Sequence, residues 1–201
     1  GGVLLRRWSS VLTGIRILDP SAGWGDRLIS ALALEDSSLG CYHGFDPNVD
    51  LQPTYSEIIR YCSPINKEDV FVKCLPFEDA VIIDGSYDLV ITSPPFFNLE
   101  QYTDSSTQSI SRFKTYPQWL RGFFVPYIIK SFNALKEDGT MIIYISDFTA
   151  GGTTFKLENE TKKIIEGIGG KLVMTDFFQG SEGTKRPAHI FKRETGHCLR
   201  S

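Results

Sequence analysis

Residues 19–27 read DPSAGWGDR, and the fold predicted for this sequence depends most on this stretch. It follows an apolar run at residues 15–18 and precedes a helix-like pattern. A glycine turn between a strand and a helix often binds a ligand, because Gly23 and Gly25 let the backbone approach it closely. Leu28 stands where the dinucleotide pattern GxGxxG needs its third glycine. The turn therefore predicts a ligand site and argues against hydride chemistry on a nicotinamide cofactor.

Short apolar runs alternate with helix-like stretches along the rest of the chain. We expect strands at residues 15–18, 41–45, 70–74, 87–92, 141–145, 172–178 and 188–192. We expect helices at residues 3–12, 27–34, 51–61, 118–135 (with a kink at Pro126) and 161–168. This alternation favours an α/β fold with a mostly parallel sheet. The last two strands have no helix between them, so the final strand should run antiparallel.

Length and composition predict one domain. The chain has 201 residues, of which 41% are hydrophobic, enough for one sizeable core. We expect the domain at residues 15–193, after an N-terminal helix or a linker to a missing part at 1–14 and before a polar tail at 194–201. The loop at residues 97–116 is long for a connection without secondary structure, which is typical of functional lids or disorder.

Charge, cysteines and hydropathy exclude some classes of function. The formal net charge of -3 counts mildly against tight nucleic-acid binding by this chain alone. The four cysteines form no CxxC pair and show no metal-ligand spacing with the three histidines, so we expect no metal. No segment approaches the ~20 apolar residues of a membrane span, and no signal-peptide pattern is recognised. We expect an intracellular protein, cytoplasmic or nuclear, that does not bind a membrane.

Acidic residues follow the second and third predicted strands. Asp46 stands 46 − 25 = 21 positions after Gly25, close to the roughly 20 expected of an acid that holds ribose hydroxyls. The alternative for Asp46 is a helix cap or a turn. After the third strand, Glu78 or Asp79 could accept a hydrogen bond from an adenine amino group, with Phe77 against the ring. A surface helix start explains these two acids equally well.

The most informative motif is Ser93-Pro94-Pro95-Phe96, at the end of the fourth predicted strand. Two consecutive prolines end a strand and stiffen the backbone. They would hold the Ser93 hydroxyl and the Pro94 carbonyl in place as hydrogen-bond acceptors beside the flat face of Phe96. A planar substrate with an exocyclic amino group could stack there and donate both N–H bonds. The alternative is a rigid turn in an aromatic core.

Together, Asp-Pro-x-x-Gly-x-Gly, the acid after the second strand and Ser-Pro-Pro-Phe resemble the class I S-adenosylmethionine-dependent methyltransferases, over roughly residues 15–193. Within them the chain looks like the DNA amino-methyltransferases that make N6-methyladenine or N4-methylcytosine. The resemblance implies a Rossmann-like methyltransferase fold, whose seven-stranded, mostly parallel sheet has an antiparallel last strand and helices on both faces. It also implies S-adenosyl-L-methionine as the cofactor and a base amino group as the methyl acceptor.

The resemblance assigns roles to residues of each motif. It implies that Asp19, Gly23 and Gly25 surround the methionine part of the cofactor and that Pro20 and Trp24 also belong to the cofactor site. Asp46 would hold the ribose, and Glu78 or Asp79 would lie near the adenine. The catalytic group would be Ser93, Pro94, Pro95 and Phe96, which would hold the target base. The serine at position 93 is commoner in the N4-cytosine enzymes, which favours cytosine slightly.

Two departures bear on the substrate. Ser21 stands where the DNA enzymes commonly have phenylalanine. Those enzymes also carry a separate target-recognition segment, for which residues 15–193 leave little room beside the predicted sheet and helices. Recognition would then lie in a missing part, in a partner subunit or in the loop at 97–116. DNA is the expected partner, with RNA as a possibility, and basic residues that could contact phosphates are Arg112, Lys114, Lys185, Arg186, Lys192, Arg193 and Arg200. A solvated surface is the alternative for these residues.

Other functions fit the same motifs. Related Asn-Pro-Pro-Tyr sites methylate RNA bases or a protein glutamine, which also presents a planar amino group. A second alternative is a catalytically silent methyltransferase-like subunit of a larger assembly. The intact glycine, acid and Ser-Pro-Pro-Phe motifs argue against a silent subunit, which has no need to keep all three.

Overall fold

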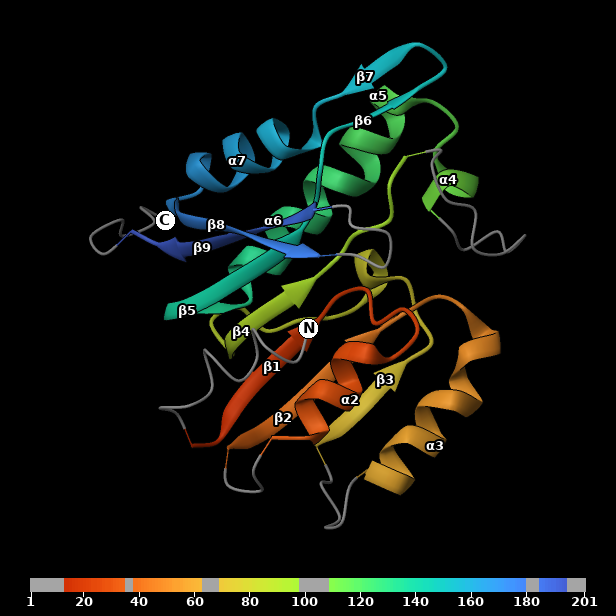
Figure 1. Ribbon diagram of the computed structural model, residues 1–201, viewed down its shortest axis with the longest axis vertical. Coiled ribbons are helices and arrows are strands. Elements are labelled where there is room, and N and C mark those ends of the chain that lie inside the picture. The colour runs from red at the N-terminus through yellow and green to blue at the C-terminus, as the bar shows by residue number, and fades with distance from the viewer. Residues whose placement is uncertain (1–12, 35–37, 63–68, 98–108, 180–184, 195–201) are drawn as a thin grey trace.

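A seven-stranded sheet organises the protein, as the computed structural model shows for residues 13–34, 38–62, 69–97, 109–179 and 185–194 (Figure 1). The strands are β1 (Ile15–Asp19), β2 (Leu39–Phe45), β3 (Val70–Lys73), β4 (Tyr87–Thr92), β5 (Leu135–Tyr144), β8 (Gly170–Gln179) and β9 (Lys185–Arg193). Their order across the sheet is β3-β2-β1-β4-β5-β9-β8. Among the described strands of this sheet, only β9 runs antiparallel to its neighbours, β5 and β8, which confirms the predicted fold class.

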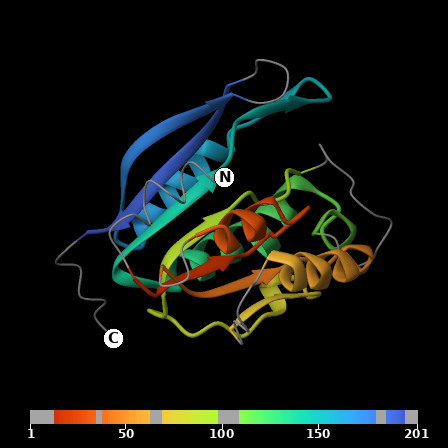
Figure 2. The same cartoon turned by 60° about the horizontal axis from the view of Figure 1, so that its bottom comes forward.

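Helices cover both faces of the sheet, so its central strands are buried on both sides. The helices α2 (Asp26–Leu32) and α3 (Gln52–Cys62) pack on one face, and α6 (Val125–Asn133) and α7 (Leu157–Gly167) on the other. Leu18 on β1 and Val90 on β4 are fully buried. Such continuous apolar runs are typical of parallel strands between two helical layers. The sheet is strongly twisted, so that β8 and β9 run steeply across the direction of β1 and β2 (Figure 2).

The strand order places a switch point in the middle of the sheet. The chain winds outward from β1 through β2 to β3, and then returns to β4 on the other side of β1. The connections that leave β1 and β4 therefore separate at their carboxyl ends and leave a crevice there. In open α/β sheets, ligands bind in this crevice.

The helix predicted at residues 118–135 consists of three helical segments. These are α5 (Tyr116–Trp119), the π-helical η3 (Leu120–Phe124) and α6. Pro126 lies in the first turn of α6, where it has no N–H to continue the α-helical hydrogen bonds. The wider π turn directly before it accommodates the proline ring. Pro126 thus marks a change of helix type, at the position where the sequence predicted a kink.

Several elements were not predicted. A hairpin of β6 (Phe148–Ala150) and β7 (Thr153–Phe155) follows β5, and its turn is made by two glycines with positive φ. Part of the predicted loop at 97–116 forms α4 (Ser109–Arg112), and the short helix η1 (Val49–Leu51) follows β2. The short helix η2 (Phe77–Asp79) follows β3, where a surface helix start was the alternative for Glu78 and Asp79.

The predicted helix at 3–12 and most of the tail at 194–201 lie outside the described residues. Within the described ranges, no helix is long and apolar enough to cross a membrane.

Candidate active site

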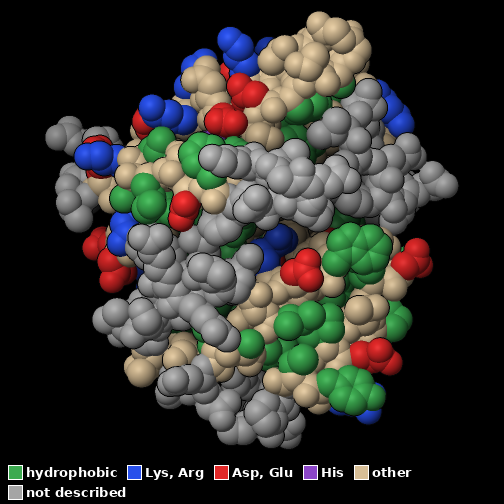
Figure 3. All heavy atoms as spheres, in the orientation of Figure 1, with side chains coloured by type: hydrophobic (Ala, Val, Ile, Leu, Met, Phe, Trp, Pro, Cys, Tyr) green, Lys and Arg blue, Asp and Glu red, His purple; other side chains and the backbone are tan. Residues whose placement is uncertain are grey.

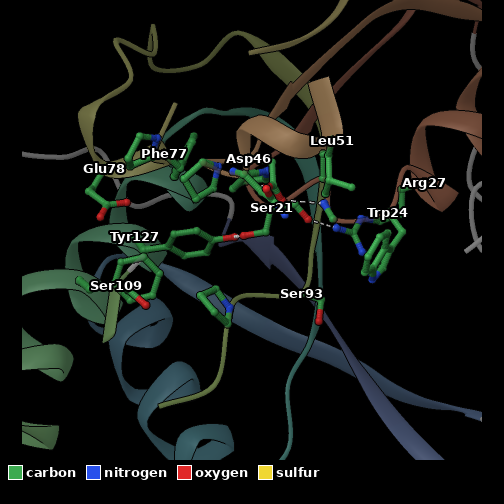
Figure 4. Close-up of a pocket in the computed structure, with 18 of the residues that line it drawn as sticks. Ser21, Trp24, Arg27, Asp46, Leu51, Phe77, Glu78, Ser93, Ser109 and Tyr127 are labelled. Carbon is green, nitrogen blue, oxygen red and sulfur yellow. Dashed lines mark hydrogen bonds between the residues drawn. The ribbon is translucent and has the colours of Figure 1, made fainter. Parts of the chain in front are cut away.

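A cavity of about 270 Å³ lies at the carboxyl ends of β1, β2 and β4 (Figure 4). The predicted site residues that line it are Pro20, Gly23, Trp24, Asp46, Glu78, Ser93, Pro95 and Phe96. The remaining predicted site residues do not line it, and these are Asp19, Gly25, Asp79 and Pro94. The fold therefore brings the glycine turn, the acid after β2 and the Ser-Pro-Pro-Phe motif to one cavity.

The glycine turn forms the floor of the cavity between β1 and α2. Gly23 and Gly25 have φ angles of 56° and 88°, in the left-handed region that favours glycine. A Cβ atom on Gly25 would lie 2.8 Å from Cδ1 of Ile58 on α3. The Tyr55 hydroxyl donates a hydrogen bond to the Gly23 carbonyl, which fixes the turn from the same helix. Gly25 thus shapes the turn without lining the cavity.

Trp24 forms part of the cavity rim. Its side chain lines the cavity but is 71% exposed. Ile29 on α2 and Tyr61 on α3 are also exposed. Figure 3 shows hydrophobic side chains gathered over α2 and α3 on this face of the molecule. An exposed indole at the rim offers an apolar surface to a ligand that enters the cavity.

Asp19 lies behind the cavity, where an arginine from the first turn of α2 neutralises its charge. The Asp19 carboxylate is fully buried and accepts hydrogen bonds from Arg27 Nε at 2.7 Å and Arg27 Nη2 at 3.1 Å. Burial by itself would lower the pKa of Arg27, but the charge and hydrogen bonds of Asp19 raise it above its usual value. The sequence analysis did not single out Arg27, although it lies within the DPSAGWGDR stretch. The sequence feature that could have identified Arg27 is its position in the first turn of a helix, where the helix dipole disfavours a positive charge.

Asp46 connects the ends of β1 and β2. One carboxylate oxygen accepts the Gly23 N–H at 2.9 Å, and the other accepts the Asn48 N–H at 2.9 Å. Burial raises the pKa of Asp46 above its usual value, although the two N–H groups act in the opposite direction. A carboxylate oxygen accepts more than one hydrogen bond. Asp46 therefore keeps acceptor capacity toward the cavity that it lines.

Only one of the two acids after β3 reaches the cavity. Glu78 lines it, whereas Asp79 is exposed and does not. Arg112 on α4 pairs with Glu78 at 2.9 Å and with Asp79 at 3.1 Å. Burial raises the pKa of Glu78. Lys130 on α6 fixes this segment by donating hydrogen bonds to three backbone carbonyls between residues 77 and 80.

Ser93, Pro95 and Phe96 form the side of the cavity that follows β4. The Phe96 ring packs edge-on against Phe148 of the β6–β7 hairpin, with 5.5 Å between ring centroids. The hairpin therefore supports the aromatic side of the cavity.

Tyr127 joins this side to the glycine turn, and the sequence analysis did not identify it. Its hydroxyl lies 2.7 Å from Ser21 Oγ and also hydrogen-bonds to Thr92, the residue before Ser93. Burial raises the pKa of Tyr127. Tyr127 comes from α6 and nothing in its local sequence distinguishes it from a core aromatic residue, so no local signal could have identified it.

A second polar cluster lies away from the cavity, toward the amino ends of the strands. Cys41, His43 and Asp69 have potential ligand atoms within 4.8 Å of one another. Cys41 and His43 stand on β2 and Asp69 directly precedes β3, so their spacing along the chain could not reveal the cluster. Both His43 nitrogens already hydrogen-bond at 2.7 Å, to Tyr87 and Asp69, and Arg16 pairs with Asp69. These contacts explain the cluster without an ion.

Two of the basic residues considered for phosphate contacts have other partners. Arg112 pairs with the acids after β3, as described above. The Arg193 guanidinium donates to the carbonyls of Phe132, Asn133 and Leu135, where it caps the end of α6. Neither side chain is therefore a simple solvated cation.

Solved structures with the same architecture are numerous, although no family model and no curated protein matches the chain. TrmN from Thermus thermophilus superposes with a TM-score of 0.64 at 13% identity, over 96% of this chain and 48% of that one. The chain thus spans about half the length of TrmN. The magnesium protoporphyrin IX methyltransferase ChlM from Synechocystis PCC 6803, solved with bound SAM, gives 0.61 at 14% identity, over 96% and 78%. The [4+2]-cyclase SpnF gives 0.64 at 10% identity, over 97% and 81%.

These similarities show the fold, which is the Rossmann-like methyltransferase fold. At such low identities they do not extend to the reaction. SpnF is a cyclase, so the same fold also serves other chemistry.

Proposed function

We propose that this protein is an S-adenosyl-L-methionine-dependent methyltransferase that modifies an exocyclic amino group of a nucleic-acid base, in DNA as N4-methylcytosine or N6-methyladenine. One observation carries the proposal: Gly23 and Asp46 line the same cavity as Ser93 and Phe96. A cofactor held by the first pair would lie beside a planar group held by the second. The proposed location of the protein is intracellular, where such a substrate occurs.

The residues of the glycine turn fit the cofactor. The open backbone at Gly23 admits close approach by the methionine part, and the Asp46 carboxylate has acceptor capacity for ribose hydroxyls. Glu78 could accept a hydrogen bond from the adenine amino group, and the buried ring of Phe77 lines the same part of the cavity. When bound, the cofactor supplies an electrophilic methyl group.

The residues after β4 would prepare the acceptor nitrogen. The lone pair of a base amino group is delocalised into the ring, which makes the nitrogen a poor nucleophile. Acceptance of one of its N–H bonds by the Ser93 hydroxyl, which lines the cavity, would direct the lone pair toward the methyl group, whereas Pro94 does not line the cavity. Phe96 would hold the base plane in place by stacking. The rate enhancement then comes mainly from positioning, for which effective molarities are large.

A duplex substrate would have to release its target base into the cavity. Base flipping costs a few kcal/mol in duplex DNA and less in single strands. The whole chain carries a formal net charge of -3, so its own contacts with phosphates are a poor source of that energy. A separate recognition domain or partner subunit therefore belongs to the proposal.

The direct test is methyl transfer from labelled cofactor to duplex DNA, single-stranded DNA, RNA and protein, followed by mass spectrometry of the nucleosides and peptides. Label in N4-methylcytosine or N6-methyladenine is the expected result. Label found only in an RNA base or a glutamine side chain would support methylation of an amino group but would show that DNA is not the substrate. Cofactor binding without transfer to any acceptor, in the presence of nuclear or cytoplasmic extract as a source of partners, would favour a silent subunit.

A further inference from the structure

The Asp19 carboxylate has no access to the cavity. It is 0% exposed, and the protein surrounds it with four hydrogen-bond donors. These are the Ser21 N–H at 3.2 Å, the Tyr42 hydroxyl at 2.7 Å, and Arg27 Nε and Nη2 at 2.7 and 3.1 Å. An acid held in this way orients its partners and does not itself touch a ligand.

Arg27 is the partner that reaches the cavity. Its side chain is 16% exposed and lines the cavity, and Figure 4 shows it beside Ser21 and Trp24. Nε and Nη2 are bound by Asp19, and Nη2 also donates to the Ser21 carbonyl. Within the described part of the chain, Nη1 has no hydrogen-bond partner. Two N–H bonds of a fixed guanidinium are therefore available to a ligand.

The charges around the cavity point to the ligand group that Arg27 would bind. Three carboxylates line the cavity, from Asp26, Asp46 and Glu78. Arg27 is the only cation among the described residues that line it. A ligand that carries both a carboxylate and positive charges would therefore place its carboxylate at Arg27.

We propose that Arg27 binds the α-carboxylate of the amino-acid end of the cofactor, and that Asp19 is a positioning residue that holds the guanidinium in place. This assignment rests on the proposed function, which supplies a ligand with a carboxylate at that end. It also divides the predicted role of Asp19 between two residues: Asp19 orients the Arg27 guanidinium, and Arg27 contacts the cofactor. Arg27 is the specificity-determining residue for the amino-acid end.

The test compares two ligands that differ by one group: S-adenosylhomocysteine and its decarboxylated analogue. Calorimetric titration of the wild-type protein should show roughly ten- to a hundredfold tighter binding of S-adenosylhomocysteine, as expected for hydrogen bonds between charged groups. Arg27→Gln should lose this preference by weakening S-adenosylhomocysteine binding while leaving the analogue within about twofold. Arg16→Gln is the matched control, because Arg16 also pairs with an aspartate but does not line the cavity. It should keep the preference.

Arg27→Gln leaves the buried negative charge of Asp19 without its partner, so a second variant removes both charges. Asp19→Asn/Arg27→Gln replaces the ion pair by two neutral amides, and circular dichroism reports whether it folds. It should also bind both ligands with similar affinity. A preference that persists in either folded variant would overturn the assignment, as would equal binding of both ligands by the wild-type protein. Failure of the wild-type protein to bind either ligand would overturn the proposed function together with this assignment.

Discussion

The Tyr127 hydroxyl lies 2.7 Å from Ser21 Oγ, and it also hydrogen-bonds to Thr92. One side chain from α6 thereby connects the turn after β1 with the end of β4. Ser21 and Tyr127 both line the cavity, and Ser93, which directly follows Thr92, lines it as well. This hydrogen-bonded link therefore fixes two sides of the cavity relative to each other.

Tyr127→Phe should loosen both sides of the cavity while keeping the packing of the ring. Thr92 is fully buried and would lose its partner, so we expect a loss of about 1–2 kcal/mol in the free energy of unfolding. Cofactor affinity should fall several-fold, since the glycine turn loses a tether. Chemical denaturation and cofactor titration measure the two effects. Tyr116→Phe, which removes a hydroxyl outside the cavity, should change stability by less than about 0.5 kcal/mol; equal effects of both variants would contradict the role of Tyr127.

Cofactor binding should weaken at acidic pH because of Asp46. Burial raises the pKa of this carboxyl, and the protonated form is a poor acceptor for ribose hydroxyls. As the pH falls through the raised pKa, affinity should drop, beginning above the usual range of an aspartate. Asp46→Asn should bind the cofactor about tenfold more weakly at neutral pH. Its affinity should change less than that of the wild-type protein across the acidic window, where Glu78 would still titrate. A pH dependence as large as that of the wild-type protein would exclude Asp46 as the main titrating group.

The same pKa shift has the opposite effect on stability. A carboxyl whose pKa is raised in the folded state binds its proton more tightly there than in the unfolded chain. The contribution of Asp46 to folding is therefore present at low pH and is lost as the pH rises through the raised pKa. Denaturation at acidic and neutral pH should show this loss in the wild-type protein and a smaller one in Asp46→Asn. A larger loss in the variant would mean that other groups dominate.

Ser93→Ala should reduce turnover and leave cofactor affinity nearly unchanged. The hydroxyl would act on the acceptor amino group and not on the cofactor, so kcat should fall roughly ten- to a hundredfold, the effect of one lost hydrogen bond. Steady-state kinetics on the substrate identified by the labelling panel measure the effect. Ser86→Ala is a suitable control, because Ser86 precedes the same strand at its other end and does not line the cavity. Full activity of Ser93→Ala would refute the assigned role.

Lys130→Met should destabilise the segment after β3. The Lys130 amino group donates to the carbonyls of Phe77, Glu78 and Ala80 at 3.2, 2.6 and 2.9 Å. Loss of these hydrogen bonds should cost about 1–3 kcal/mol of stability and weaken binding of the adenine part. Thermal and chemical denaturation provide the measurement.

Lys136→Met is the matched control for this prediction. Lys136 pairs with Asp88 at 2.6 Å, but both side chains are partly exposed, so the solvent screens the pair. We expect a loss of no more than about 1 kcal/mol there. If the two lysine variants were equally stable, the three carbonyl contacts of Lys130 would have little energetic weight.

Local patterns in the sequence determined the strands and their alternation with helices. The apolar runs of β1 and β4 and the turn with Gly23 and Gly25 depend on side-chain type and backbone freedom over a few residues, which a single sequence displays. The antiparallel last strand followed from a missing helix. The predicted start of the fifth strand was wrong, since β5 begins at Leu135 and not at residue 141. A register shift opposite β4 accommodates the additional residues, and it depends on pairing between distant strands.

The tertiary structure decided which of the predicted residues meet at the cavity. Asp19 and Gly25 belong to the same motif as Gly23, but of these three only Gly23 lines it. The contact of Arg27 with Asp19 and that of Tyr127 with Ser21 depend on side-chain direction and on segments far apart in the chain. Such contacts leave no periodic signal, because a hydrogen bond needs one pair of atoms in place and no pattern around them. The sequence alone therefore determined the fold and the site's neighbourhood, whereas packing in three dimensions determined which side chains face the ligand and which hold them there.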